Sequence, residues 1–277
     1  MSDEATTFCL DLEDASWAYL FGFLQADGHL QESTRNRGRV SVELGAQDRW
    51  LVEQFAALVP FASSLRTRTR TTNFRQEYTS IVWEVCDRRF REALKAAGLT
   101  AGQKSRTVAA PNLPFAEADY WRGVVDADGS LGLTSLGFPF VSLITSSDAL
   151  AADFLAFVDR VTGSEKTARR NTRDHVFNIA VFKEQAQTLA RTLYADAATL
   201  ALPRKKAKAS AMIAWRRPET MRRMSRQRPW NAEQDHFILS HALEESAARL
   251  GRTEKSVTMR LWRLTGSVLV PGKSVTD

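Results

Sequence analysis

The chain has 277 residues, 44% of them hydrophobic and 25% charged, which is enough apolar content to bury the cores of two modest domains. No apolar run approaches the roughly 20 residues that span a bilayer, and the two cysteines lack the paired spacing of a zinc site or disulfide framework, so we expect a cytoplasmic protein with no membrane partner. A net charge of +6 is typical of a protein that binds a polyphosphate, although a merely basic soluble protein would share it.

The first predicted element is an apolar helix near the N-terminus, and its pattern returns once further along the chain. Residues 17–30 and 118–132 match in one frame at a separation of 101 residues. Such self-similarity is typical of a duplicated unit. The matching pairs are Gly22 and Gly123, Ala26 and Ala127, Asp27 and Asp128, Gly28 and Gly129, and Leu30 and Leu131.

The elements after the first helix also repeat. Residues 48–59 and 147–158 have helical apolar spacing, residues 79–85 and 175–182 alternate like strands, and residues 91–99 and 185–194 favour a further helix. Each half is therefore predicted as helix, two strands, helix, two strands, helix. The fold class is α+β, with two pseudo-twofold related αββαββα halves at residues 1–113 and 114–215.

Each apolar helix ends in an aspartate followed by a glycine. We expect Gly28 and Gly129 to adopt the left-handed conformation just past the last helical turn. An aspartate at a helix C-terminus loses about 0.3 to 1 kcal/mol to the helix dipole. Asp27 and Asp128 therefore suggest a bound cation, whereas ordinary Asp-Gly turns that close two buried helices are the structural alternative.

The spacing of the other glycines suggests how the two aspartates meet. Gly22 and Gly123 lie five residues before them and would let two helices approach closely. Asp27 and Asp128 would then emerge together with the carbonyl oxygens of Ala26 and Ala127. Oxygen ligands of this kind suit Mg²⁺, with Mn²⁺ as a substitute, and such a metal would clamp a phosphodiester and activate water.

A lysine follows each aspartate at the same distance. Lys104 lies 77 residues after Asp27, and Lys205 lies 77 residues after Asp128. Arg204 and Lys206 flank the second lysine and are alternatives to it.

Residues 20–28 and 121–129 resemble the two signature helices of the LAGLIDADG homing endonucleases of the two-motif, single-chain type. Residues 193–209 are similar to a later turn of that family, and the resemblance covers about three quarters of the chain. It implies a saddle of two antiparallel sheets on double-stranded DNA with a long target site. It also implies a monomer without an obligate protein partner, associated with the nucleoid.

The resemblance implies that this site-specific endonuclease cleaves both strands. Asp27 and Asp128 would be the catalytic metal ligands, and Lys104 and Lys205 would stabilise phosphate charge or polarise the attacking water. Gln25 stands where the family has the aspartate that this chain retains as Asp126, so we expect unequal cutting of the two strands. The alternatives are a non-cleaving DNA-binding regulator and an intron-RNA maturase of the same fold.

Arginines cluster in the stretches that we predict as strands. Alternating arginines on a strand share one face, which can bind guanine edges or phosphates, although solubilising charge is the alternative. The candidate DNA-binding residues are Arg35, Arg37, Arg39, Arg66, Arg68, Arg70, Arg75, Arg169, Arg170 and Arg173.

The C-terminal part is predicted as a basic linker at 216–228, a small all-α domain at 229–266 and a tail at 267–277. The domain resembles a Myb or SANT-like helix-turn-helix whose last helix would enter a major groove, and a protein-binding helical module is the alternative. The candidate contacts are Arg252, Lys255, Ser256, Arg260 and Arg263.

Overall fold

The computed structural model describes residues 8–72, 75–196, 200–219, 221 and 230–266, with the backbone alone at 72, 75 and 76. The chain divides into two compact units, Met1–Arg216 and Arg217–Asp277, each of which is described by itself. Most of the predicted linker and the whole predicted tail lie outside the described residues. No described helix is both long enough and apolar enough to cross a membrane.

The first half of the larger unit has the predicted order of helix, two strands, helix, two strands, helix. Its sheet is antiparallel throughout, in the order β1-β2-β4-β3. The elements are α1 (Ala15–Asp27), β1 (His29–Gln31), the short 3-10 helix η1 (Arg35–Arg37), β2 (Arg39–Gly45), η2 (Ala46–Asp48), α2 (Arg49–Leu58), β3 (Ser63–Thr72), β4 (Arg75–Val85) and α3 (Arg88–Ala96).

The second half has the order helix, two strands, helix, one strand, two helices, which is one strand fewer and one α-helix more than the first half; its sheet is antiparallel in the order β5-β6-β7. The strand expected around residues 169–173 was wrong, because only an isolated bridge joins Arg170 to Phe177 and His175 turns the chain at a φ of 54°. The elements are α4 (Glu117–Asp128), β5 (Gly129–Leu133), β6 (Pro139–Thr145), α5 (Asp148–Thr162), β7 (Phe177–Phe182), α6 (Lys183–Tyr194) and α7 (Pro203–Ile213).

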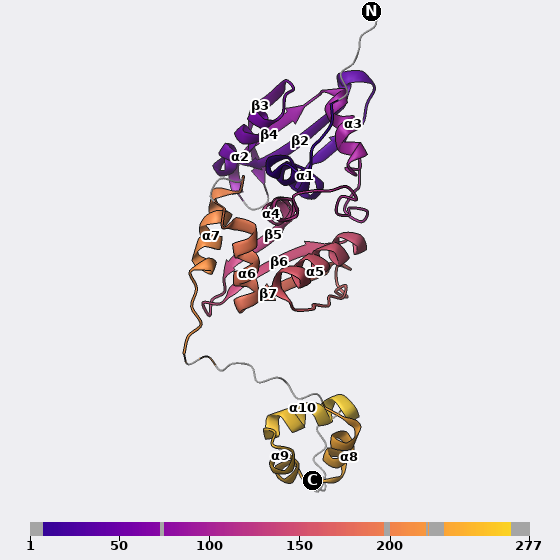
Figure 1. The fold of residues 1–277 in the computed structure, drawn as a ribbon, viewed down its shortest axis with the longest axis vertical. Helices are drawn as coiled ribbons and strands as arrows, with labels where there is room; N and C mark the ends of the chain where they lie inside the picture. The colour runs from indigo at the N-terminus through magenta and orange to yellow at the C-terminus, as the bar shows by residue number, and fades with distance from the viewer. Residues whose placement is uncertain (1–7, 73–74, 197–199, 220, 222–229, 267–277) are drawn as a thin grey trace, which may run out of the picture. The chain divides into compact units, whose positions relative to one another are not determined.

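Helices α1 and α4 lie side by side between the two sheets (Figure 1). Residues 18–25 of α1 and 120–126 of α4 are buried, and their polar members Gln25, Arg122 and Asp126 have hydrogen-bond partners inside the protein. The sheets add alternate residues to the core, such as Val40 and Val42 from β2 and Val141 and Leu143 from β6. The opposite face of each sheet is left open.

The smaller unit contains α8 (Ala232–Ser240), α9 (Leu243–Leu250) and α10 (Glu254–Thr265). Its core is Ile238, Val257 and Leu261. The side chains of Asn231 and Thr253 cap α8 and α10, since they accept hydrogen bonds from the first turns of these helices. A tight turn with a left-handed glycine, Gly251, follows α9.

Candidate active site

The close approach of α1 and α4 depends on two glycines, as the sequence predicted. A Cβ atom on Gly22 would overlap the carbonyl oxygen of Tyr120, and one on Gly123 would overlap that of Tyr19. The two positions are equivalent in the repeat. The backbones therefore cross at van der Waals contact, and the C-termini of the helices emerge together.

The glycines after the two aspartates serve a different purpose from the one predicted. Gly28 and Gly129 have φ angles of −76° and −85° with extended ψ, so the left-handed expectation was wrong. A Cβ on Gly28 would lie 2.6 Å from the carbonyl oxygen of Leu24, and one on Gly129 would lie 2.7 Å from that of Val125. The chain folds tightly over the last helical turn as it enters β1 or β5, and a side chain does not fit there.

Asp27 and Asp128 end the two helices, where their electrostatic environment opposes ionisation. Burial and the charge of Asp128 raise the pKa of Asp27 to about 6. Burial also raises the pKa of Asp128, while Lys104 and Lys205 lower it. Both side chains still reach solvent, and neither carboxylate accepts a hydrogen bond or forms an ion pair within the described residues. Two negative charges therefore meet with open oxygen positions.

Lys104 and Lys205 close the carboxyl ends of the two helices. The Lys104 ammonium donates to the carbonyl oxygens of Leu24 and Gly28. The Lys205 ammonium donates to the backbone carbonyl oxygens of Val125 at 2.6 Å, Asp126 at 2.7 Å and Gly129 at 2.8 Å. These contacts offset the negative end of each helix dipole.

Burial lowers the pKa of both lysines to about 8, although the nearby carboxylates raise it.

The structure also distinguishes Lys205 from the adjacent basic residues. Arg204 instead pairs with Asp48 at 3.1 Å and so joins α7 to the first half. Of the three basic residues 204–206, Lys205 is the one whose ammonium caps the end of α4.

A buried hydrogen-bond network that sequence reasoning missed links the two helices. The Tyr19 hydroxyl donates to Asp126 at 2.7 Å, and the Tyr120 hydroxyl donates to Gln25 at 2.7 Å. Tyr19 and Tyr120 are also 101 residues apart, so the repeat itself carried this signal. Gln25 is only 2% exposed and lies within the helix interface.

The oxygen atoms present at the helix ends fit a magnesium ion. The described residues contain no cluster of three or more His, Cys, Asp or Glu side chains able to hold a metal. The candidate set is Asp27 and Asp128 with backbone oxygens, and neither lysine donates to the carbonyl of Ala26 or Ala127. Carboxylates that repel one another and accept no hydrogen bond within the described residues favour a hard cation.

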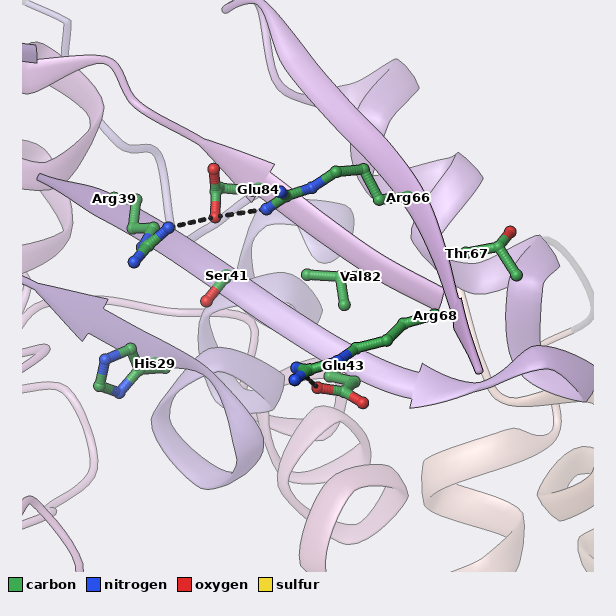
Figure 2. A pocket seen from close by; sticks show the side chains of 9 residues that line it. All are labelled: His29, Arg39, Ser41, Glu43, Arg66, Thr67, Arg68, Val82 and Glu84. Atoms are coloured by element: carbon green, nitrogen blue, oxygen red, sulfur yellow. Dashed lines mark hydrogen bonds and ion pairs between the residues drawn. The ribbon is translucent and has the colours of Figure 1, made fainter. Parts of the chain in front are cut away.

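The open face of the first sheet carries a ladder of arginines and glutamates. Glu84 binds Arg39 and Arg66, each at 3.1 Å, and Glu43 lies 3.1 Å from Arg70 and 3.9 Å from Arg68. Figure 2 shows most of this ladder around a hollow of about 420 Å³. Arg66, Arg68 and Arg70 share one face of β3, as the alternation predicted.

The other predicted arginines of the larger unit lie elsewhere. The strand pattern expected for Arg35 and Arg37 was wrong, because both belong to η1, and only Arg39 continues into β2. Arg170 is engaged by the protein, since it donates to Asp148 at 2.6 Å and to the Ser146 carbonyl at 2.9 Å. Arg173 pairs with Asp174. Arg169 is exposed, and the side chain of Arg75 lies outside the described residues.

The candidate contacts of the smaller unit fall into two groups. Arg260 forms two hydrogen bonds with Asp235, at 2.8 and 2.5 Å, and Arg252 lies 3.9 Å above the ring of Trp230. These two arginines help to hold the three helices together. Lys255 and Arg263 are exposed on α10, whereas Ser256 is half-buried.

A scan against protein-family models finds no match for this sequence, and a search of curated proteins finds none. Among solved structures, the chain is similar to several homing endonucleases. The LAGLIDADG homing endonuclease I-GzeII in complex with its DNA target has 12% identity and a TM-score of 0.48, with 71% of this chain and 88% of that chain covered.

The homing endonuclease I-WcaI bound to its DNA recognition sequence has 11% identity and a TM-score of 0.49, with coverages of 76% and 94%. Mesophilic variants of I-DmoI have 12% identity and a TM-score of 0.45, with coverages of 71% and 97%. These likenesses concern the fold only. The Myb-like character of the smaller unit stays a prediction.

Proposed function

We propose that this protein is a site-specific double-strand DNA endonuclease that hydrolyses phosphodiester bonds with divalent metal. The observation that carries the proposal is the pair of carboxylates, Asp27 and Asp128, at the ends of two helices in backbone contact. A lysine caps the end of each helix, and β1, the first strand of the sheet that carries the arginines, begins two residues beyond Asp27. Such a site joins metal ligands, cationic groups and a surface for the duplex.

Each residue has a distinct part in this proposal. Asp27 and Asp128, with the carbonyls of Ala26 and Ala127, would hold Mg²⁺ or Mn²⁺. The bound metal supplies an activated water and neutralises charge on the scissile phosphate. Lys104 and Lys205 hold the helix ends in place and present positive charge to the phosphate. A site for each strand follows from the duplication.

The test is a selection of cleaved targets followed by plasmid cleavage. A randomised duplex library is incubated with the full chain in Mg²⁺, and the recovered target is cloned into a supercoiled plasmid. We expect linear product with the wild type. Asp27→Asn and Asp128→Asn should each lower the cleavage rate at least about 100-fold, since both carboxylates serve one metal cluster.

The control is Asp159→Asn, which changes a carboxylate on α5, outside the candidate site. Sequence-selective binding without any nicking in Mg²⁺ or Mn²⁺ would instead identify a DNA-binding regulator. Preferential binding of structured intron RNA would identify a maturase.

A further inference from the structure

The two open sheet faces differ completely in chemistry. Residues that point away from the core on the first sheet include four arginines and two glutamates. On the second sheet, none of the described strand residues on the open face is charged. They are Ser130, Gly132, Phe140, Ser142, Ile144, Asn178, Ala180 and Phe182.

The first face has the donors and acceptors that read G·C pairs. An arginine binds the O6 and N7 atoms of guanine with two hydrogen bonds, and a glutamate accepts from the N4 amine of cytosine. Glu84 and Glu43 each lie between two arginines, so the ladder holds the guanidinium groups in fixed places before DNA arrives. The ion pairs with the glutamates also partly neutralise these arginines, which weakens their binding to the phosphates of unrelated DNA.

The row along β3 has a spacing that matches the duplex. Residues on one face of a strand are about 6.6 Å apart, because each residue rises about 3.3 Å. Base pairs are stacked at about 3.4 Å. Arg66, Arg68 and Arg70 therefore address every second base pair.

The second face offers apolar atoms where the first offers charges. Ile144 and Phe182 are 51% and 49% exposed; Phe140 pairs directly with Phe182, and the pair of Ser142 and Ala180 lies between them and Ile144. The thymine methyl group is the one apolar feature of the major groove, and apolar side chains recognise it. The hydroxyl and amide groups of Ser130, Ser142 and Asn178 complete a surface without charge.

Two lysines of the second half lie at the margins of its open face. Lys183 follows Phe182, with its ammonium 5.6 Å from the ring centre of Phe138. Lys208 of α7 lies beside Gly132 at the β5 edge of the sheet. An apolar floor with cations at its margins fits a base edge flanked by phosphates. The two sheets hold equivalent places in the repeat, because β1 follows the helix that ends in Asp27 and β5 follows the helix that ends in Asp128.

We propose that the DNA target of this chain has two unlike halves, a G·C-rich half with guanines at alternate positions under β3 and a T-rich half under β6 and β7. The proposal rests on the proposed function, because it requires DNA on both faces. Specificity in the second half comes from methyl contacts, and in the first half from charged hydrogen bonds.

The test replaces thymine with deoxyuridine, which removes only the methyl group. Affinity of the full chain for its selected target is measured in Ca²⁺, with the substitution made in one half at a time. We expect about a fourfold loss per buried methyl in the T-rich half. The same substitution in the G·C-rich half should have no effect.

Two variants complete the cycle. In Ile144→Ala and Phe182→Ala the effect of deoxyuridine should disappear at the contacted positions, whereas Leu136→Ala, an exposed apolar residue in the β5–β6 turn, should keep the full effect. In a repeated selection, Arg68→Ala should lose the preference for one guanine only.

The outcomes separate this proposal from the function on which it rests. No selective DNA binding at all would contradict the proposed function. Selective binding that is indifferent to the methyl groups would overturn the two-halves proposal alone. A change of oligomeric mass in Phe182→Ala, with the deoxyuridine effect intact, would show that the second face binds protein.

Discussion

The hydroxyl of Tyr19 on α1 donates a hydrogen bond to the buried carboxylate of Asp126 on α4. The mirror contact joins Tyr120 to Gln25, so each helix donates to the other from an equivalent position. Asp126 also accepts from Tyr194 at 2.6 Å and from the Leu202 amide at 2.7 Å. These donors lower the pKa of Asp126, although burial raises it overall.

The difference between Gln25 and Asp126 follows from their surroundings. The Gln25 amide nitrogen donates to the Ala109 carbonyl at 3.1 Å, which a carboxylate could not do. Ala109 follows Lys104 closely, and Leu202 precedes Lys205. Gln25 and Asp126 therefore each bind the segment that carries the lysine of their half: Gln25 donates to a carbonyl oxygen, and Asp126 accepts from an amide.

Exchanging these polarities should destabilise the protein. We expect Asp126→Asn and Gln25→Glu each to lower the free energy of unfolding by about 1 to 3 kcal/mol. The asparagine can place a second donor against the donors around residue 126, and the glutamate places an acceptor against the Ala109 carbonyl oxygen. Chemical denaturation measures the change. Glu165→Gln, an exposed acid-to-amide change on the surface, is the matched control. Wild-type stability in Asp126→Asn would contradict the role of the network.

The close crossing of α1 and α4 predicts that even a methyl group at Gly22 or Gly123 strongly destabilises the protein. Gly22→Ala and Gly123→Ala should each cost about 3 kcal/mol or more, since the new methyl group meets backbone that cannot move aside without separating the helices. Thermal unfolding measures the loss. Gly45→Ala is the control, because its Cβ would meet nothing closer than 3.5 Å. Equal melting temperatures for Gly22→Ala and Gly45→Ala would argue against backbone contact.

The raised pKa of Asp27 makes stability depend on pH without metal. Its folded-state pKa of about 6 exceeds the ordinary 3.8, so its ionisation opposes folding as pH rises through this window. Asp27→Asn should therefore be more stable than the wild type at pH 7.5 in EDTA, and the advantage should vanish near pH 4. Denaturation at both pH values tests this. A difference in unfolding free energy between Asp27→Asn and the wild type that stays constant with pH would show that the pKa of Asp27 is not raised.

The lysines predict a separate effect on catalysis. Lys205→Met and Lys104→Met should lower the rate of nicking about 100-fold or more and leave affinity for the target nearly unchanged, because both ammonium groups lie at the helix ends, away from the sheet faces. The cleavage rate of the wild type should also fall above pH 8, where both lysines lose their charge. Lys95→Met, on the surface of α3, should cleave normally. Loss of DNA affinity in Lys205→Met would point to a binding role.

In the smaller unit, arginines that look alike in the sequence should behave differently. Arg260→Ala should unfold the three helices, because it removes the bonds to Asp235 and a contact with Trp230. Lys255→Ala should leave them folded. Limited proteolysis of the full chain distinguishes the two, and DNA affinity at two salt concentrations then shows whether Lys255 contacts phosphate. Resistance of Arg260→Ala to the protease would refute the structural role.

The sequence by itself determined the duplication, the α+β order of the first half and the residues that meet at the helix ends. These features follow from local periodicity and from a fixed offset of 101 residues, and both can be read from the order of the residues alone. Gly22, Asp27 and Lys104 could be predicted because each has a partner in the same frame.

Only the tertiary structure decided which polar groups face one another. Arg66 and Arg260 have the same chemistry in the sequence, yet one lies on an open sheet and the other is bound to Asp235. The sequence showed Gln25 only as a departure from the motif, and the structure shows that Ala109 and Tyr120 are its hydrogen-bond partners. The reason is physical: hydrogen bonds and ion pairs act over about 3 Å between residues that are far apart in the chain, and folding alone brings them within that distance.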